Sequence, residues 1–343
     1  MPNFRPLLAA LLTLLFAAPV GAAEGDAEPS VEVEEAPAPK APRKITGRNC
    51  LGQPQPAAVM RSLFGIKYGE WGLEERLSVG ACVPLWKDKG ILFDLSAFEA
   101  GFLLHATPIY AMPGAYMTFA PLSILSFMVE GAPIFYWPIN VSSAGYYPIA
   151  SYDSDFSKAA LPAEDGGTAL GWYVRFGANL QLAVPIGPIR LIVVDSVRFE
   201  HFSIGDQPFY FHNRNDLPAA RNDWFVDNTA IVLAELRPHV NVRVRLGVND
   251  QLIMNLGGNK ISNAVRGVMM INFEKVGPRI RDFMPILAVG GRTHHPIRQG
   301  DFNFIVALSF AVDLSRTVDP SERKGKRSKK TADFVMPPLP FAG

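Results

Sequence analysis

The sequence predicts an all-β fold: an antiparallel up-and-down transmembrane β-barrel of about 10 to 12 strands, with a disordered N-terminal linker and a C-terminal tail. Three observations lead to this prediction. The chain opens with the features of an export signal. Apolar and polar residues then alternate over far more positions than a strand of a soluble domain needs. A tight turn built from Gly and Pro joins two of these alternating segments.

The N-terminal segment 1–23 has the three zones of a secretory signal peptide. Arg5 supplies the positive start, Leu7–Ala18 is the apolar run, and small residues follow Pro19. The run is about 12 residues long, whereas a helix that spans a membrane needs about 20. We therefore expect export with cleavage after Ala22 or Ala23, and not a membrane anchor.

The rest of the chain divides by composition. Residues 24–48 are rich in Glu, Ala and Pro, which predicts a disordered linker. We expect a periplasmic N-terminal segment over 49–72, the barrel over 73–315 and a tail over 316–343. The tail contains the basic run Glu322–Lys330 and the apolar Met336–Phe341, which could bind envelope partners; a solvated extension is the alternative.

Charge and cysteine content restrict the kinds of partner and site. The formal net charge of +1 gives no argument for binding nucleic acid. Two cysteines, Cys50 and Cys82, are expected to form a disulfide in an oxidising compartment, which would pin the N-terminal segment to the first predicted strand. Two thiols make a poor metal cage, and we predict neither a metal nor a cofactor.

The segment Thr168–Val184 carries the clearest strand signal. Its residues alternate between an apolar face, which includes Trp172 and Phe176, and a face that includes Arg175. The turn Pro185–Pro188 leads into a second strand that runs to Glu200. In that strand Ile192 and Val194 intrude on the polar face and Asp195 breaks the apolar one.

Further strands are predicted more briefly. Val240–Val248 and Phe302–Leu314 repeat the alternation. Weaker candidates are Leu73–Leu85, Ile91–Leu104, Ala115–Val129, Thr229–Leu236, Val268–Val276 and Phe283–Val289. Phe102–Trp137 alternates poorly, so a partly buried helix stays open there, while Tyr146–Gly167 and His212–Asn228 are predicted to be long loops on one side of the barrel.

Strands of this length suit hydrocarbon, because only helices and closed barrels satisfy every backbone group inside a membrane. Aromatic residues near strand ends would form interfacial girdles: Trp172, Phe199, Trp224, Phe225 and Phe302. The chain resembles the broad class of Gram-negative outer-membrane β-barrel proteins through its signal peptide, long alternating strands and short turns. The resemblance implies outer-membrane lipids and the barrel-assembly machinery as partners. Such barrels often end on an aromatic residue of the last strand, whereas here a tail follows Leu314, which leaves open whether the assembly signal is internal, around Phe310–Leu314. A soluble periplasmic β-protein that binds an apolar ligand is the alternative.

Several charged residues are predicted to face the lumen. They are Arg175, Arg190, Arg198, Arg243, Arg245 and Glu235, with Glu200 among them. If they pair, they plug a narrow lumen; if they line a passage, they favour anions. Since about 10 to 12 strands make a narrower barrel than the 16–18 strands of general porins, we expect a narrow or closed lumen. The leading hypothesis is a barrel with a role in envelope structure, adhesion or selective passage.

One catalytic alternative remains. His201 and Ser203 lie two residues apart, which places both on one face of a strand. Their order resembles the His-x-Ser element of outer-membrane lipid A deacylases, which implies His201 as base and Ser203 as nucleophile, but no orienting acid can be assigned. Polar residues at the interfacial end of a strand are the simpler reading. His294–His295 stands in a turn-like setting and is expected to be solvated.

Overall fold

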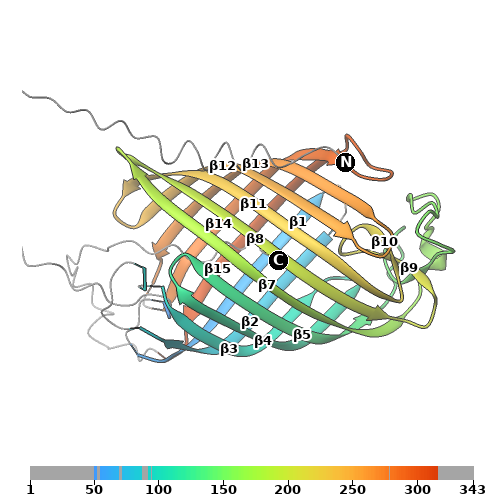
Figure 1. The fold of residues 1–343 in the computed structure, drawn as a ribbon, viewed down its shortest axis with the longest axis horizontal. Coiled ribbons are helices and arrows are strands. Elements are labelled where there is room, and N and C mark those ends of the chain that lie inside the picture. The colour runs from blue at the N-terminus through green and yellow to red at the C-terminus, as the bar shows by residue number, and fades with distance from the viewer. Residues whose placement is uncertain are drawn as a thin grey trace, which may run out of the picture. The chain divides into compact units, whose positions relative to one another are not determined.

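The computed structural model describes residues 50–51, 55–68, 72–86, 92–93, 95–277 and 279–315. Within them the chain forms one closed antiparallel barrel of twelve strands (Figure 1). The barrel strands are β1 (Ala57–Tyr68), β2 (Gly72–Pro84), β3 (Ala97–Ala106), β4 (Tyr110–Leu122), β5 (Leu125–Tyr136), β7 (Ala169–Ile186), β8 (Ile189–Ile204), β11 (Asn222–His239), β12 (Val242–Asn255), β13 (Lys260–Lys275), β14 (Ile280–His294) and β15 (Phe302–Asp313).

Each barrel strand pairs with its sequence neighbours in the wall, and β1 pairs with β15 to close it. All-β architecture and barrel closure are therefore as the sequence predicts, and twelve is the upper end of the predicted strand number. Alternation along the strands sorts side chains to the two faces of the wall. On β7, Leu170 is 69% exposed, whereas Tyr173 and Arg175 are at most 1% exposed.

The two ends of the barrel differ. At one end, called here the short-turn end, the connections include Ser123–Ile124, Gly187–Pro188 and Val240–Asn241. Gly187 has φ of 59°, a conformation that glycine adopts without steric cost, and this allows the two-residue turn. The even number of strands places the start of β1 and the end of β15 at this same end, where Val59 pairs with Asp313.

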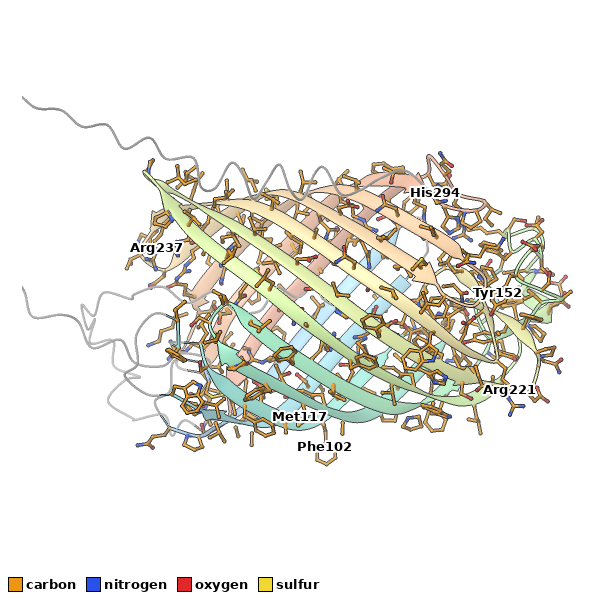
Figure 2. All side chains as sticks on the ribbon, viewed as in Figure 1. Phe102, Met117, Tyr152, Arg221, Arg237 and His294 are labelled. Atoms are coloured by element: carbon orange, nitrogen blue, oxygen red, sulfur yellow. A yellow bond between two sulfur atoms is a disulfide. The ribbon has the colours of Figure 1, made fainter. Side chains whose placement is uncertain are left out.

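The opposite end, called here the loop end, carries the longest connections. The segment 137–168 contains β6 (Tyr147–Pro148) and the 3-10 turn η1 (Ala163–Asp165), while 205–221 contains β9 (Phe209–His212) and β10 (Leu217–Ala220). Strands β6, β9 and β10 form a separate three-stranded sheet in the order β10-β9-β6 (Figure 1). Figure 2 shows Tyr152 and Arg221 at this end and Arg237 at the other.

Some strand predictions were wrong in their boundaries. The barrel begins at Ala57 and not at residue 73, because β1 lies inside the predicted N-terminal segment. The predicted strand Ala115–Val129 is two strands, β4 and β5, joined at Ser123–Ile124, so the apolar stretch Phe102–Trp137 holds strands and no helix. The predicted loop His212–Asn228 ends early, because β11 starts at Asn222.

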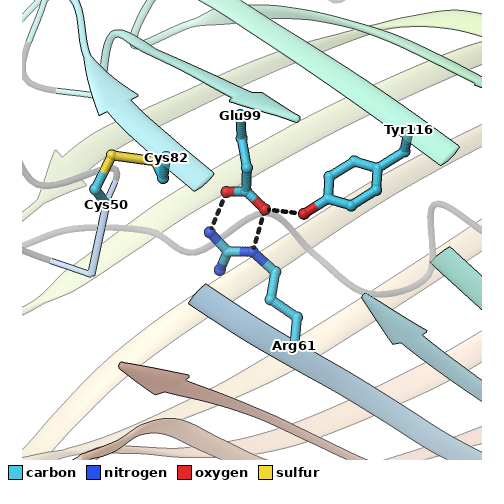
Figure 3. Close-up of a disulfide and its surroundings, with 5 residues drawn as sticks. All are labelled: Cys50, Arg61, Cys82, Glu99 and Tyr116. Carbon is cyan, nitrogen blue, oxygen red and sulfur yellow. Dashed lines mark hydrogen bonds and ion pairs between the residues drawn. A yellow bond between two sulfur atoms is a disulfide. The ribbon is translucent and has the colours of Figure 1, made fainter. Parts of the chain in front are cut away.

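A disulfide joins Cys50 to Cys82, as predicted, and fixes the chain ahead of β1 to the end of β2 (Figure 3). Both cysteines are buried against Ala57, Val59 and Ala97. Beside them, Arg61 Nη2 donates to Glu99 Oε2 at 2.8 Å and Tyr116 Oη donates to Glu99 Oε1 at 2.7 Å. This polar group ties β1, β3 and β4 together near the short-turn end.

No helix in the described part of the chain combines the length and apolar character that a membrane crossing requires. The predicted signal peptide, linker and basic tail lie outside the described residues.

Candidate functional site: a filled lumen under an inserted hairpin

The outer surface of the barrel is an apolar belt. Large apolar side chains point away from the wall all around it, among them Phe102 at 78% exposed and Met117 at 44% (Figure 2). The inner face carries the buried charges instead. A soluble ligand-binding barrel has the opposite arrangement, apolar inside and polar outside, whereas a lipid-facing barrel needs this one. The chain is therefore a transmembrane β-barrel of the outer-membrane type.

Aromatic residues contribute to this belt. Trp172, Phe199, Trp224 and Phe302 are between 37% and 55% exposed on its outer face. Phe225 was wrongly grouped with them, because it is 0% exposed and packs inward against Phe202. It faces the opposite way from its neighbour Trp224, as the period of two requires.

Four of the five predicted lumen arginines are buried on the inner face. Arg175, Arg198, Arg243 and Arg245 are at most 1% exposed, and the Arg190 side chain is 28% exposed. Arg175 on β7 stands directly opposite Glu130 on β5 and Glu200 on β8 in the strand register. Its Nη1 lies 2.6 Å from Glu130, and its Nε donates to Glu200 at 2.5 Å.

Three more carboxylates, Asp227, Glu235 and Glu274, complete the pairing of this set. Arg198 Nη1 lies 3.1 Å from Asp227, its direct cross-strand partner on β11. Glu235 accepts from Arg245 Nε at 2.8 Å and lies 3.5 Å from Arg190. Arg243 also lies between Glu235 and Glu274. Opposite charges at directly facing positions stabilise adjacent strands, and here they also occupy the lumen.

Apolar side chains fill the inner face beside these charges. Ile192 and Val194, which intrude on the polar face of the β8 pattern, point inward and face Leu233 and Ile231 on β11. They belong to an apolar cluster that reaches across the inner wall to Met270, Ile286 and Ala307. Paired charges and packed apolar groups therefore lie side by side on the inner face of the wall.

A hairpin packs on the inner wall at the loop end. Strands β9 and β10, called here the hairpin plug (Phe209–Ala220), pair with each other and pack on the inner wall. Tyr210, Leu217 and Ala219 are each 0% exposed. They belong to a cluster with wall residues from β4, β5, β7, β8 and β11, of which Phe202 and Phe225 are fully buried. Full burial of large apolar side chains on both sides fixes the hairpin inside the barrel mouth.

Ion pairs between side chains hold the tip of the hairpin plug. Asp216 is 2% exposed and has φ of 53°, a left-handed conformation that Asp tolerates better than most residues. Its carboxylate lies 2.7 Å from Arg292 Nη2, 2.9 Å from Arg298 Nη1 and 3.3 Å from His295 Nε2. We call Asp216 with these three partners the latch, since it joins the plug to β14 and the following loop.

A cavity of about 460 Å³ lies beneath the hairpin tip. The tip residues 213–216 line it together with inner-face residues of β1, β2, β12, β13 and β15. Basic side chains outnumber acidic ones in its lining. The basic residues are Lys67, Arg76, Lys158, Arg214, Arg266 and Arg298, and the acidic residues are Glu74, Asp216 and Asp227. We call this space the plug cavity.

His201 and Ser203 lie on the outer face of β8, as their spacing predicts. The His201 ring lies between Trp172 and Trp224, with ring centroids 4.9 and 4.8 Å away and the Trp224 ring edge-on. Within the described residues, no hydrogen bond joins His201 to Ser203 or to a carboxylate, although a general base needs such contact with its nucleophile. The hydrolase alternative therefore gains no support from the geometry.

Sequence reasoning missed the latch. His295 was expected to be a solvated loop residue, yet it is 3% exposed and bonded to Asp216. Asp216 itself stands in a segment predicted to be loop. Metal binding by His294–His295 finds no third ligand, since no group of His, Cys, Asp and Glu in the described part of the chain could hold an ion.

No family model matches the chain, and no curated protein matches it. Among solved structures, the NanC porin has 10% identity and a TM-score of 0.35 over 75% of this chain and 100% of its own. The β-domain of the Bordetella autotransporter BrkA has 12% identity and a TM-score of 0.36 over 76% and 98%. OmpT, an outer-membrane protein of Vibrio cholerae, has 8% identity and a TM-score of 0.30 over 75% and 96%. At these scores no residue role transfers to this chain.

Proposed function

We propose that this barrel sits in the outer membrane of a Gram-negative bacterium and passes small anions through a lumen that the hairpin plug closes. The loop end then faces the outside and the short-turn end faces the periplasm, which agrees with the predicted export signal. The single observation that carries the proposal is the plug cavity, whose lining holds six Lys or Arg and three Asp or Glu directly beneath a separable hairpin.

We infer that the plug is released from the wall as a unit. It is one short hairpin between β8 and β11, and these two strands pair directly with each other up to Ser203 and Asn222. Removal of the connecting segment would therefore leave the barrel wall paired. Charged clefts with low-dielectric walls concentrate counter-ions, so the excess of cations at the mouth favours entry of anions over cations.

The test is conductance in planar bilayers with a KCl gradient. Wild-type protein is expected to stay mainly closed with rare openings. A variant in which a short Gly-Ser linker replaces residues 206–221 is expected to carry steady current. Its reversal potential should lie nearer to the equilibrium potential of chloride than to that of potassium. Heat-modifiable gel mobility first establishes that both proteins are folded barrels. Absence of current from the folded deletion variant at every voltage would reject passage and leave a structural or adhesive barrel.

A further inference from the structure

Arg266 on β13 is a buried cation that has no carboxylate partner in the described part of the chain. It is 2% exposed, and its guanidinium donates to three neutral amide oxygens. These are Asn303 Oδ1 at 2.6 Å, Asn249 Oδ1 at 3.2 Å and Gln251 Oε1 at 3.3 Å. Among the residues that the structure describes, no carboxylate lies within ion-pair distance of it. Since an unneutralised buried charge is costly, this position favours the approach of an anion.

The strand register sets up this environment. Arg266 pairs directly with Asn249 on β12 and with Gly290 on β14, and Gly290 pairs with Asn303 on β15. Because Gly290 has no side chain, Arg266 Nε reaches across it to Asn303. A Cβ at Gly290 would lie 1.9 Å from the Val265 carbonyl oxygen, so a larger residue does not fit. The amides orient the guanidinium without neutralising it.

Two further donors on the cavity wall lack acceptors. Arg214 Nη1, at the hairpin tip, and Asn249 Nδ2 are buried and have no hydrogen-bond partner among the described residues. The Arg214 side chain is 8% exposed. Within the residues that the structure describes its carboxylate contact is Glu200 at 3.5 Å, which also lies 2.5 Å from Arg175. Arg214, Asn249 and Arg266 all line the plug cavity, so its walls offer positive charge and free N–H groups together.

The remaining lining is largely apolar. Leu63, Ile253 and Ile305 belong to it, with Tyr110 at the rim of β4. A volume of about 460 Å³ lies within the ~300–1,000 Å³ that ligand sites usually span. A hydrated inorganic ion would leave these apolar walls uncovered, whereas a carboxylate with an apolar body would satisfy both parts of the lining.

We propose that the plug cavity is a binding site for a small organic carboxylate with an apolar body, whose anionic end is held by Arg266 and Arg214. The carboxylate accepts the free N–H groups, and the apolar body covers Leu63, Ile253 and Ile305. This inference extends the proposed passage of anions by naming its solute class. The test of this site measures ligand binding and not current, so a failure of the binding site can be told apart from a failure of anion passage.

The experiment is calorimetric titration of the full-length protein in lipid nanodiscs at pH 7.5, with empty nanodiscs as the blank. The probe is 4-phenylbutyrate, and 4-phenylbutan-1-ol is its neutral counterpart of the same shape. Acetate supplies the charge without the apolar body. Saturable 1:1 binding of 4-phenylbutyrate is expected, with binding of the alcohol and of acetate each weaker by about tenfold or more.

Matched variants separate the site from the general charge of the lumen. Arg266→Gln should weaken 4-phenylbutyrate binding about tenfold or more. Arg245→Gln removes another buried lumen arginine, one that already pairs with Glu235 at 2.8 Å and does not line the cavity, and should leave binding unchanged. If Arg245→Gln fails the gel-shift test for folding, the exposed Arg237→Gln replaces it as the control.

Three results would overturn the proposal. The first is equal binding of the acid and the alcohol, since the charge would then play no part. The second is acetate binding as tight as that of 4-phenylbutyrate, since the apolar walls would then be irrelevant. The third is an unchanged affinity in folded Arg266→Gln protein. Binding without conductance would uphold this site and reject only the passage function.

Discussion

The latch offers the sharpest test of whether the hairpin plug is a movable closure. The change is Asp216→Asn, which keeps the size of the side chain and removes its charge. In the structure Asp216 is 2% exposed and faces Arg292 at 2.7 Å, Arg298 at 2.9 Å and His295 at 3.3 Å. The variant therefore removes the carboxylate that these two buried guanidinium groups share.

The size of the effect follows from that burial. Removing one partner of a buried ion pair costs about 3–5 kcal/mol. The apolar contacts of Tyr210 and Leu217, at about 1.5–3 kcal/mol each, are not touched by the change, so they still favour docking. The loss of the latch should therefore raise the fraction of released hairpin by a factor between about 10² and 10⁴.

The assay is single-channel recording at fixed voltage, with the fraction of time spent open as the readout. Asp206→Asn is the matched control, because Asp206 stands exposed in the same connection. We expect frequent long openings from Asp216→Asn, and rare openings from wild type and from the control. Folded Asp216→Asn protein that opens as rarely as wild type would show that the latch does not hold the plug, and the reasoning from burial and charge would be wrong.

Three other predictions test the lumen and the loop end. Burial lowers the pKa of His212 in β9 to about 3, while a released hairpin would restore an ordinary value near 6.5. As pH falls, His212 is protonated in the released hairpin before it is protonated in the docked one. The free energy that favours docking is therefore largest above about pH 6.5, and it decreases by about 1.4 kcal/mol per pH unit as pH falls toward 3. Openings should increase at pH 4.5, and His212→Gln should reduce that increase. Glu130→Gln removes the carboxylate that lies 2.6 Å from Arg175 and 2.7 Å from Arg76, and should lower stability by about 3–5 kcal/mol in urea unfolding; an unchanged midpoint would contradict this pairing. Cys50→Ser should cost about 2–4 kcal/mol in the same assay, and reductant should give wild type the same loss while leaving the variant unaffected.

Alternation in the sequence predicted strands well where the inner face is polar. On β7 the inward Tyr173, Arg175 and Asn179 contrast with outward Trp172 and Phe176, so the period of two is plain. The same contrast predicted the closed barrel.

Alternation failed where the inner face is also apolar. In β1, the inward Leu63 packs against the apolar cluster of the lumen and follows the polar Ser62 of the other face, so the alternation is interrupted there. In β4 and β5, Met112 and Ile134 point inward because the hairpin plug packs on them. The poor pattern that suggested a helix therefore lies where the plug contacts the wall.

Pairing in the lumen depends on register, which composition does not encode. Glu130 meets Arg175 only because β5 and β7 align at that position. Asp216 meets Arg292 across 76 positions of sequence, through a hairpin whose insertion has no local signal. The arginines could be placed on a face from the sequence, but their partners required the three-dimensional arrangement.

Closure of the wall by β1 and β15 also bears on how the barrel assembles. Val59 and Asp313 lie at the two extremes of the described chain and must meet in register. These two segments are about 250 residues apart in the sequence. Bringing them together costs roughly 5 kcal/mol of loop-closure entropy before their hydrogen bonds stabilise the pair. Every other pair of adjacent strands in the wall is separated by far fewer residues, so these pairs can form earlier. The pairing of β1 with β15 is therefore expected to form last. A partly assembled barrel would stay open longest between these two strands.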